Sequence, residues 1–116
     1  MSEKKSDILF RRAYAYILAH YMEVDLNRDR IAAALGCSTR SLSRAFEGTI
    51  TIPEAIRRLR LQKARDFLHK RSHLTIKQIA EKVHFCDAKY FSRCFKELFR
   101  LSPSEERENI VRRKKE

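Results

Sequence analysis

The stretch LTIKQIAEKVHFCDAKYFSRCF, residues 74–95, decides the fold. Apolar residues recur at helical spacing on both sides of a short break at 84–87. About 48 residues earlier the chain reads LNRDRIAAALGCSTRSLSRAF, residues 26–46, which matches it with one residue fewer in the break. Leu26 and Phe46 correspond to Leu74 and Phe95. Such a repeat indicates that one structural unit is used twice.

Each copy predicts two short helices joined by a tight turn. In the first copy Asn27 and Ser38 suit N-cap positions, and Gly36 suits the turn that ends the first helix. In the second copy Asp87 caps the second helix. Two short helices connected in this way form a helix-turn-helix.

Three further helices are expected around the two copies. Ser6 suits the cap of a first helix that ends near residue 22, packed as a brace for the first lobe. A T-x-x-E capping box at Thr51 opens the longest helix, which runs to about Lys70 and spans about 28 Å. Ser102 and Pro103 begin a short last helix, followed by a charged tail that we expect to be frayed. With two glycines, two prolines and little β-branched alternation, the sequence predicts an all-α fold.

The charge of the chain indicates a polyanionic partner. Twenty-six Lys and Arg residues against fifteen Asp and Glu give a net charge of +11, which favours nucleic acid. No apolar run reaches the roughly 18 residues of a membrane span, and the polar start MSEKKSD lacks the apolar core of a signal peptide. We therefore expect a cytoplasmic, nucleoid-associated protein that does not bind a membrane.

Cysteine and histidine spacing predicts no cofactor and no metal. The three cysteines have no CxxC or Cys/His pairing, and the four histidines share no ligand spacing. No Ser/His/Asp or Cys/His arrangement is legible, so we expect no enzyme activity, and no small-molecule site is visible.

From about Val24 to Arg107 the chain resembles the DNA-binding domain of the AraC/XylS family of bacterial transcription regulators. The residues that carry the resemblance are IAAALGCSTRSLSRAF, RLRLQKARDFL and TIKQIAEKVHFCDAKYFSRCFKELFRLSPSEER. The resemblance implies two three-helix, homeodomain-like helix-turn-helix lobes joined by a long linker helix. It also implies promoter binding, usually with activation through RNA polymerase. The expected divisions are a first lobe at 6–50, the linker helix at 51–71, a second lobe at 72–110 and a basic tail at 111–116.

The second helix of each helix-turn-helix is expected to enter a DNA major groove. The exposed faces and the resemblance together assign base readout to six residues: Arg40, Ser43, Arg44, Lys89, Ser92 and Arg93. The resemblance also implies contacts with the DNA backbone by Thr39, Ser41, Tyr90 and Lys96. Two such helices on one chain fit successive grooves only if they lie about 34 Å apart. The first lobe, with its glycine turn and two arginines, is expected to dominate specificity.

Four residues depart from the family pattern. His84 and Arg100 stand where the family usually has glycine, so the turn at His84 must accept a positive φ or adjust. Glu106 stands where an aromatic residue is frequent, and Arg28 takes a usually apolar position.

Several interpretations stay open. The chain is either a stand-alone regulator or the DNA-binding part of a longer protein. An alternative function is a protein-interaction module, an anti-activator that keeps the fold but binds DNA weakly or without specificity. A basic amphipathic protein on anionic membranes is a further alternative, and it would require the apolar stripe of the long helix to be exposed.

Overall fold

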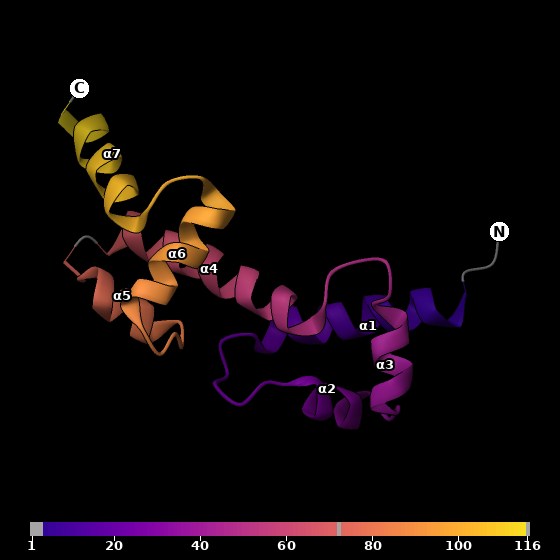
Figure 1. Ribbon diagram of the computed structural model, residues 1–116. Helices are drawn as coiled ribbons and strands as arrows, with labels where there is room; N and C mark the ends of the chain where they lie inside the picture. Colours follow the sequence, from indigo (N-terminus) through magenta and orange to yellow (C-terminus); the bar gives the residue numbers. More distant parts are fainter. Residues whose placement is uncertain (1–3, 72, 116) are drawn as a thin grey trace. The chain divides into compact units, whose positions relative to one another are not determined.

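The computed structural model describes residues 4–71 and 73–115 (Figure 1). These residues form seven helices and no strand, which confirms the all-α prediction. The helices are α1 (Lys5–His20), α2 (Arg28–Leu35), α3 (Thr39–Ala45), α4 (Ile52–Lys70), α5 (Ile76–Lys82), α6 (Ala88–Phe99) and α7 (Pro103–Lys115). None of the helices within the described ranges is both long and apolar enough to cross a membrane.

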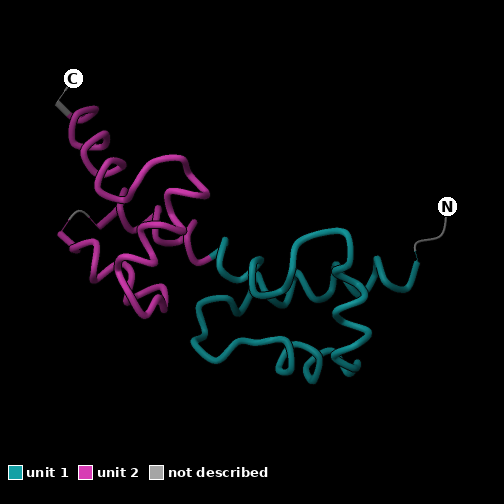
Figure 2. The backbone as a smooth tube through the Cα atoms, in the orientation of Figure 1, with its two compact units in different colours: residues 1–59 teal, residues 60–116 magenta. Residues whose placement is uncertain are grey.

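The chain forms two compact units (Figure 2). The first unit ends at Leu59 and the second begins at Arg60, so the boundary falls inside α4. The first half of this helix therefore belongs to the core of one unit and the second half to the core of the other. Each unit contains one copy of the repeat.

In the first unit α1 packs against both α2 and α3. Ala13 and Ile17 on α1 are fully buried, as are Ile31 on α2 and Leu42 on α3. The ring of Phe10 lies 4.7 Å from that of Phe46, between ring centroids. This core holds the helix-turn-helix pair on the apolar face of α1, which confirms the brace expected from the sequence.

The second unit is built around phenylalanine. Phe91 and Phe95 on α6 are fully buried, and the Phe91 ring lies 5.3 Å from Phe85 and 5.9 Å from Phe95, between centroids. Ile79 on α5 completes this side of the core. Because aromatic pairs at these distances add to the stability that burial alone gives, α6 is firmly held on its inner face.

Most helix ends match the sequence prediction. The Asn27 side chain accepts from the Arg30 N–H at 2.9 Å, and Ser38 accepts from the Ser41 N–H at 3.0 Å. Ser102, which was expected to begin the last helix, forms a capping box with Glu105: each side chain accepts from the other's backbone N–H, at 3.1 and 3.0 Å. At the start of α5, Thr75 and Gln78 form a second reciprocal capping box.

Two predicted ends were wrong. Ser6 is not a cap, because α1 begins at Lys5 and the Lys4 carbonyl accepts from the N–H groups of Asp7 and Ile8 at 3.0 and 3.2 Å. The charged tail is not frayed at residue 111, since α7 continues to Lys115. Arg and Lys have high helix propensity, so the polar composition of this segment does not end the helix.

Candidate nucleic-acid interface

The turn of each helix-turn-helix has the same backbone conformation. Gly36 has φ 68° and His84 has φ 67°. The Gly36 N–H donates to the Ala33 carbonyl, at 3.2 Å, and the His84 N–H donates to the Glu81 carbonyl in the corresponding way, at 3.1 Å. His84 therefore adopts the left-handed conformation of a glycine, and the extra residue of the second copy is accommodated after it.

Helix α3 exposes two cations opposite its buried face. Leu42 and Ala45 are buried, and Arg40 and Arg44 are exposed. The two arginines are four residues apart, so their side chains leave the same side of the helix. Ser41 is exposed as well, and its hydroxyl accepts from that of the cap Ser38 at 3.0 Å.

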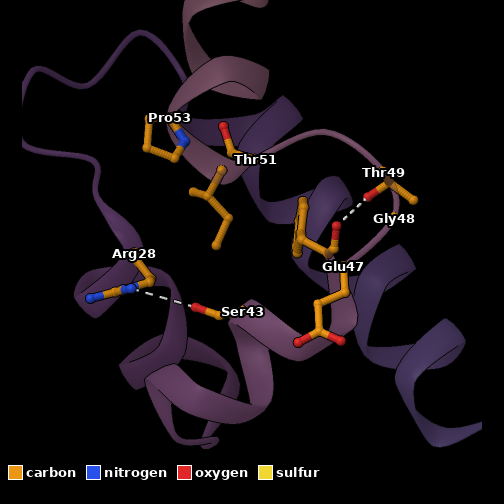
Figure 3. Close-up of a pocket in the computed structure, with 9 residues that line it drawn as sticks. Arg28, Ser43, Glu47, Gly48, Thr49, Thr51 and Pro53 are labelled. Carbon is orange, nitrogen blue, oxygen red and sulfur yellow. Dashed lines mark hydrogen bonds between the residues drawn. The ribbon is translucent and has the colours of Figure 1, made fainter.

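Ser43 is half-buried and faces a pocket of its own unit (Figure 3). Its hydroxyl accepts from the Arg28 guanidinium, at 3.5 Å, and the two side chains point toward each other. The Thr49 hydroxyl donates to the Phe46 carbonyl at 2.7 Å and closes the loop that forms one wall. The pocket has a volume of about 350 Å³ and is lined by Arg28, Ser43, Phe46, Glu47, Gly48, Thr49, Thr51, Ile52 and Pro53.

Helix α6 carries the corresponding exposed set in the second unit. Lys89 and Arg93 occupy the repeat positions of Arg40 and Arg44, and both are exposed. The Arg93 guanidinium lies 5.3 Å from the centroid of the Tyr90 ring, and that ring lies 5.8 Å from Phe85. Because Tyr90 rests on the core, it supports one face of the Arg93 guanidinium and restricts its orientations.

The ten residues that the sequence assigned to DNA fall into two groups by exposure. Seven are exposed: Arg40, Ser41, Arg44, Lys89, Tyr90, Arg93 and Lys96. Thr39, Ser43 and Ser92 are half-buried. All ten lie on α3 or α6. DNA contact by any of them stays a prediction.

Two further cations lie beside these exposed sets, one in each unit, although in the sequence they stand out only as departures from the family pattern. Arg28 contacts Ser43 from α2. The two residues are 15 positions apart in the sequence, so helical spacing could not predict this contact. Arg100 follows α6 and is exposed. Its spacing from Lys89, Arg93 and Lys96 is helical, and that signal could have identified it.

Known proteins are similar to this chain in sequence. The family described as Helix-turn-helix domain matches residues 31–109. YpdC of Escherichia coli, an uncharacterized HTH-type transcriptional regulator, is 32% identical over 106 residues, which are 90% of this chain and 36% of the relative. The chain thus spans about a third of the length of the curated relatives it matches.

Solved structures agree with the sequence match. The C-terminal domain of AraT, a response regulator from Geobacillus stearothermophilus, matches with a TM-score of 0.75 and 31% identity, over 91% of this chain and 88% of that one. A transcriptional regulator of the AraC-type DNA-binding-domain proteins, from Chromobacterium violaceum, matches with a TM-score of 0.79 and 29% identity, over 90% of this chain and 94% of that one.

Proposed function

The chain belongs to the AraC-type helix-turn-helix family of transcription regulators, and from this premise we propose that it binds double-stranded DNA sequence-specifically and activates transcription. The family is a class of DNA-binding regulators rather than of enzymes. The observation that carries the proposal is the matched pair of exposed cations on α3 and α6, each opposite a buried core face. Such a regulator acts on promoters at the nucleoid, with RNA polymerase as its further partner.

The chemistry of readout depends on the side chains. An arginine can donate two hydrogen bonds to the O6 and N7 atoms of one guanine, which distinguishes that base pair in the major groove. Arg44 and Arg93 are the matched candidates, with Arg40 and Lys89 one turn before them. Arg93 is the better preorganised of the pair, because Tyr90 supports its guanidinium. A side chain that is already ordered loses less entropy when it binds.

We propose that Ser43 contributes to DNA binding through its position rather than as a free hydroxyl. Its Oγ already accepts from Arg28. The pair puts a cation beside α3, where a guanidinium can contact a phosphate while it holds the serine. Phosphate contacts of this kind fix the register of the recognition helix without reading sequence.

One chain carries both recognition helices, so a second copy is not required to supply the second one. We propose that they occupy adjacent major grooves, whose centres lie about 34 Å apart on B-DNA. The two exposed sets differ in composition, with Arg40 in one and Lys89 in the other. The preferred site is accordingly two different half-sites rather than a palindrome.

A selection from randomised duplex DNA tests the proposal. The wild-type chain should enrich an asymmetric pair of motifs about one helical turn apart. Arg44→Ala should relax base preference in one half and Arg93→Ala in the other, each by about 1 to 3 kcal/mol of discrimination. Arg113→Ala, which removes an exposed cation from α7, is the matched control and should keep both motifs.

Two results would overturn this proposal. If no sequence is enriched by the wild-type chain, the protein-interaction alternative is favoured. If both arginine variants keep the wild-type preference at fixed salt, the assignment of readout to Arg44 and Arg93 is wrong.

A further inference from the structure

Helix α6 carries a stripe of four cations that extends beyond the residues proposed for base readout. Lys89, Arg93, Lys96 and Arg100 are all exposed. They are spaced by four, three and four residues, which keeps them on one side of a helix. The stripe is about 16.5 Å long at 1.5 Å per residue. The opposite side of α6 is the buried phenylalanine face.

Arg100 occupies this stripe at a conformational cost. It ends α6 with φ 69°, and its N–H donates to the Lys96 carbonyl at 2.8 Å. Glycine adopts this backbone conformation freely, whereas a side chain makes it unfavourable. Within the described ranges no hydrogen bond or ion pair engages the Arg100 side chain to offset this cost. The helix cap explains this backbone conformation but not the presence of an arginine side chain, which is therefore a starting point for a functional hypothesis.

The first unit has no counterpart to this extension. Helix α3 has 7 residues and α6 has 12. The position that matches Lys96 holds Glu47, and the next residue is Gly48. Beyond Arg44, therefore, the first recognition helix offers no further cation.

The C-terminal half of the stripe surrounds a hollow of about 310 Å³, lined by Arg93, Lys96, Glu97 and Arg100. Three cations and one carboxylate leave an excess of two positive charges there. Within the part of the chain described, no ion pair joins Glu97 to either arginine. Lys96 is near enough to the Glu105 carboxylate to help lower its pKa, so the two arginines are the cations available to an external anion.

We propose that this half of α6 binds DNA phosphates, with Arg100 as the outermost contact, so that the second unit supplies an affinity increment that is independent of sequence. The proposal rests on the proposed DNA-binding function. The major groove is about 12 Å wide, which is less than the length of the stripe. If Lys89 and Arg93 reach base edges, Lys96 and Arg100 therefore lie toward the phosphates at the edge of the groove. Phosphates accept hydrogen bonds from Arg and Lys irrespective of the base sequence.

Salt dependence of binding to one mixed-sequence duplex separates this role from a structural one. Each phosphate neutralised adds about 0.9 to the slope of log affinity against log salt. Arg100→Gly should lower this slope by about 1 and weaken binding about eightfold at 0.1 M salt. The loss of affinity should be the same on duplexes of unrelated sequence. The fold should persist, because glycine favours this conformation. Arg100→Lys should restore most of the lost slope relative to Arg100→Gly, since it returns the charge.

Two control variants make the result specific. His84→Gly replaces the second non-glycine residue of positive φ among the residues that the structure describes, and it removes no lysine or arginine, so the slope should not change. Arg113→Gln removes a charge from an exposed site on α7 and should also leave the slope unchanged. Equal slopes for Arg100→Gly and the wild-type chain would overturn the proposal, as would an equal loss in Arg113→Gln. Failure of the wild-type chain to bind duplex DNA would instead refute the proposed function itself.

Discussion

Removal of Arg65 should destabilise the second unit more than removal of its partner, Glu106. The Arg65 Nε donates to a Glu106 carboxylate oxygen at 2.6 Å, and Nη2 donates to the other oxygen at 3.4 Å. The Arg65 guanidinium also lies 4.6 Å from the centroid of the Phe99 ring. The glutamate side chain is 8% exposed and the arginine side chain 43% exposed. The carboxylate therefore depends on its partner more than the guanidinium does.

This difference in exposure sets the magnitudes. Removing one partner of a buried pair typically costs about 3 to 5 kcal/mol, because the remaining charge is left without compensation. For Arg65→Met we expect about 2 to 3 kcal/mol, at or below the lower end of this range, since water can reach the arginine side of the pair. Glu106→Leu should cost less than about 1 kcal/mol, because the freed guanidinium can turn to solvent and an apolar side chain takes the buried place. The double variant should recover most of the loss of Arg65→Met.

A double-mutant cycle on these variants provides the test. Urea unfolding gives the free energies, and native-state hydrogen exchange of α7 amides reports on the second unit if the two units unfold in separate steps. We expect a coupling energy of about 2 kcal/mol between the two positions. Equal costs for the two single variants, or additivity within about 0.5 kcal/mol, would refute this reasoning.

Two further predictions concern the first unit. Gly36→Ala should destabilise it by about 1 to 2 kcal/mol in urea unfolding. The cost comes from the backbone, because φ is 68° and the added Cβ would meet no atom within 4 Å. Gly36→Asn should cost less, and equal costs for the two variants would contradict a backbone origin of the destabilisation. The pKa of Glu23 is lowered by hydrogen bonds from Arg30 first and His20 second, so its stabilisation is present above the ordinary pKa of about 4.3 and is lost as pH falls through the lowered value. The stability difference between wild type and Glu23→Gln should accordingly narrow below about pH 4, and a constant difference in acid would argue against this linkage.

Local sequence signals were sufficient for the helix starts wherever a capping side chain and the backbone N–H from which it accepts lie within one turn. Asn27, Ser38 and Asp87 cap the helices that they were expected to cap. The failure at Ser6 has the same physical basis: a serine caps only if its own backbone is extended, and Lys4 holds that conformation instead. Capping residues identify a helix start only to within the few positions that compete for it.

Contacts between distant positions were not accessible in this way. The exposed faces of α3 and α6 could be predicted because helical spacing relates neighbours on one element. Two such contacts, Arg28 with Ser43 and Arg65 with Glu106, each join residues of different helices. Glu106 was recognised only as a departure from an aromatic position. The structure explains it, because the arginine that pairs with it packs on Phe99 in the same core.

The two copies of the repeat share a turn and differ in the helix that comes after it. Gly36 and His84 have the same φ, so the turn itself does not make the lobes unequal. After α3 the chain has Gly48 at φ 77°, and Thr49 bonds back to the Phe46 carbonyl, which ends the helix. At the corresponding place α6 continues through Lys96 and Glu97, residues of high helix propensity. The same change that lengthens the second recognition helix also places Lys96 where the first copy has Glu47. Local helix propensity therefore accounts for the difference in length, while the exchange of Glu47 for Lys96 changes the charge, and we expect Lys96 and Arg100 to give the second lobe the larger share of the salt dependence.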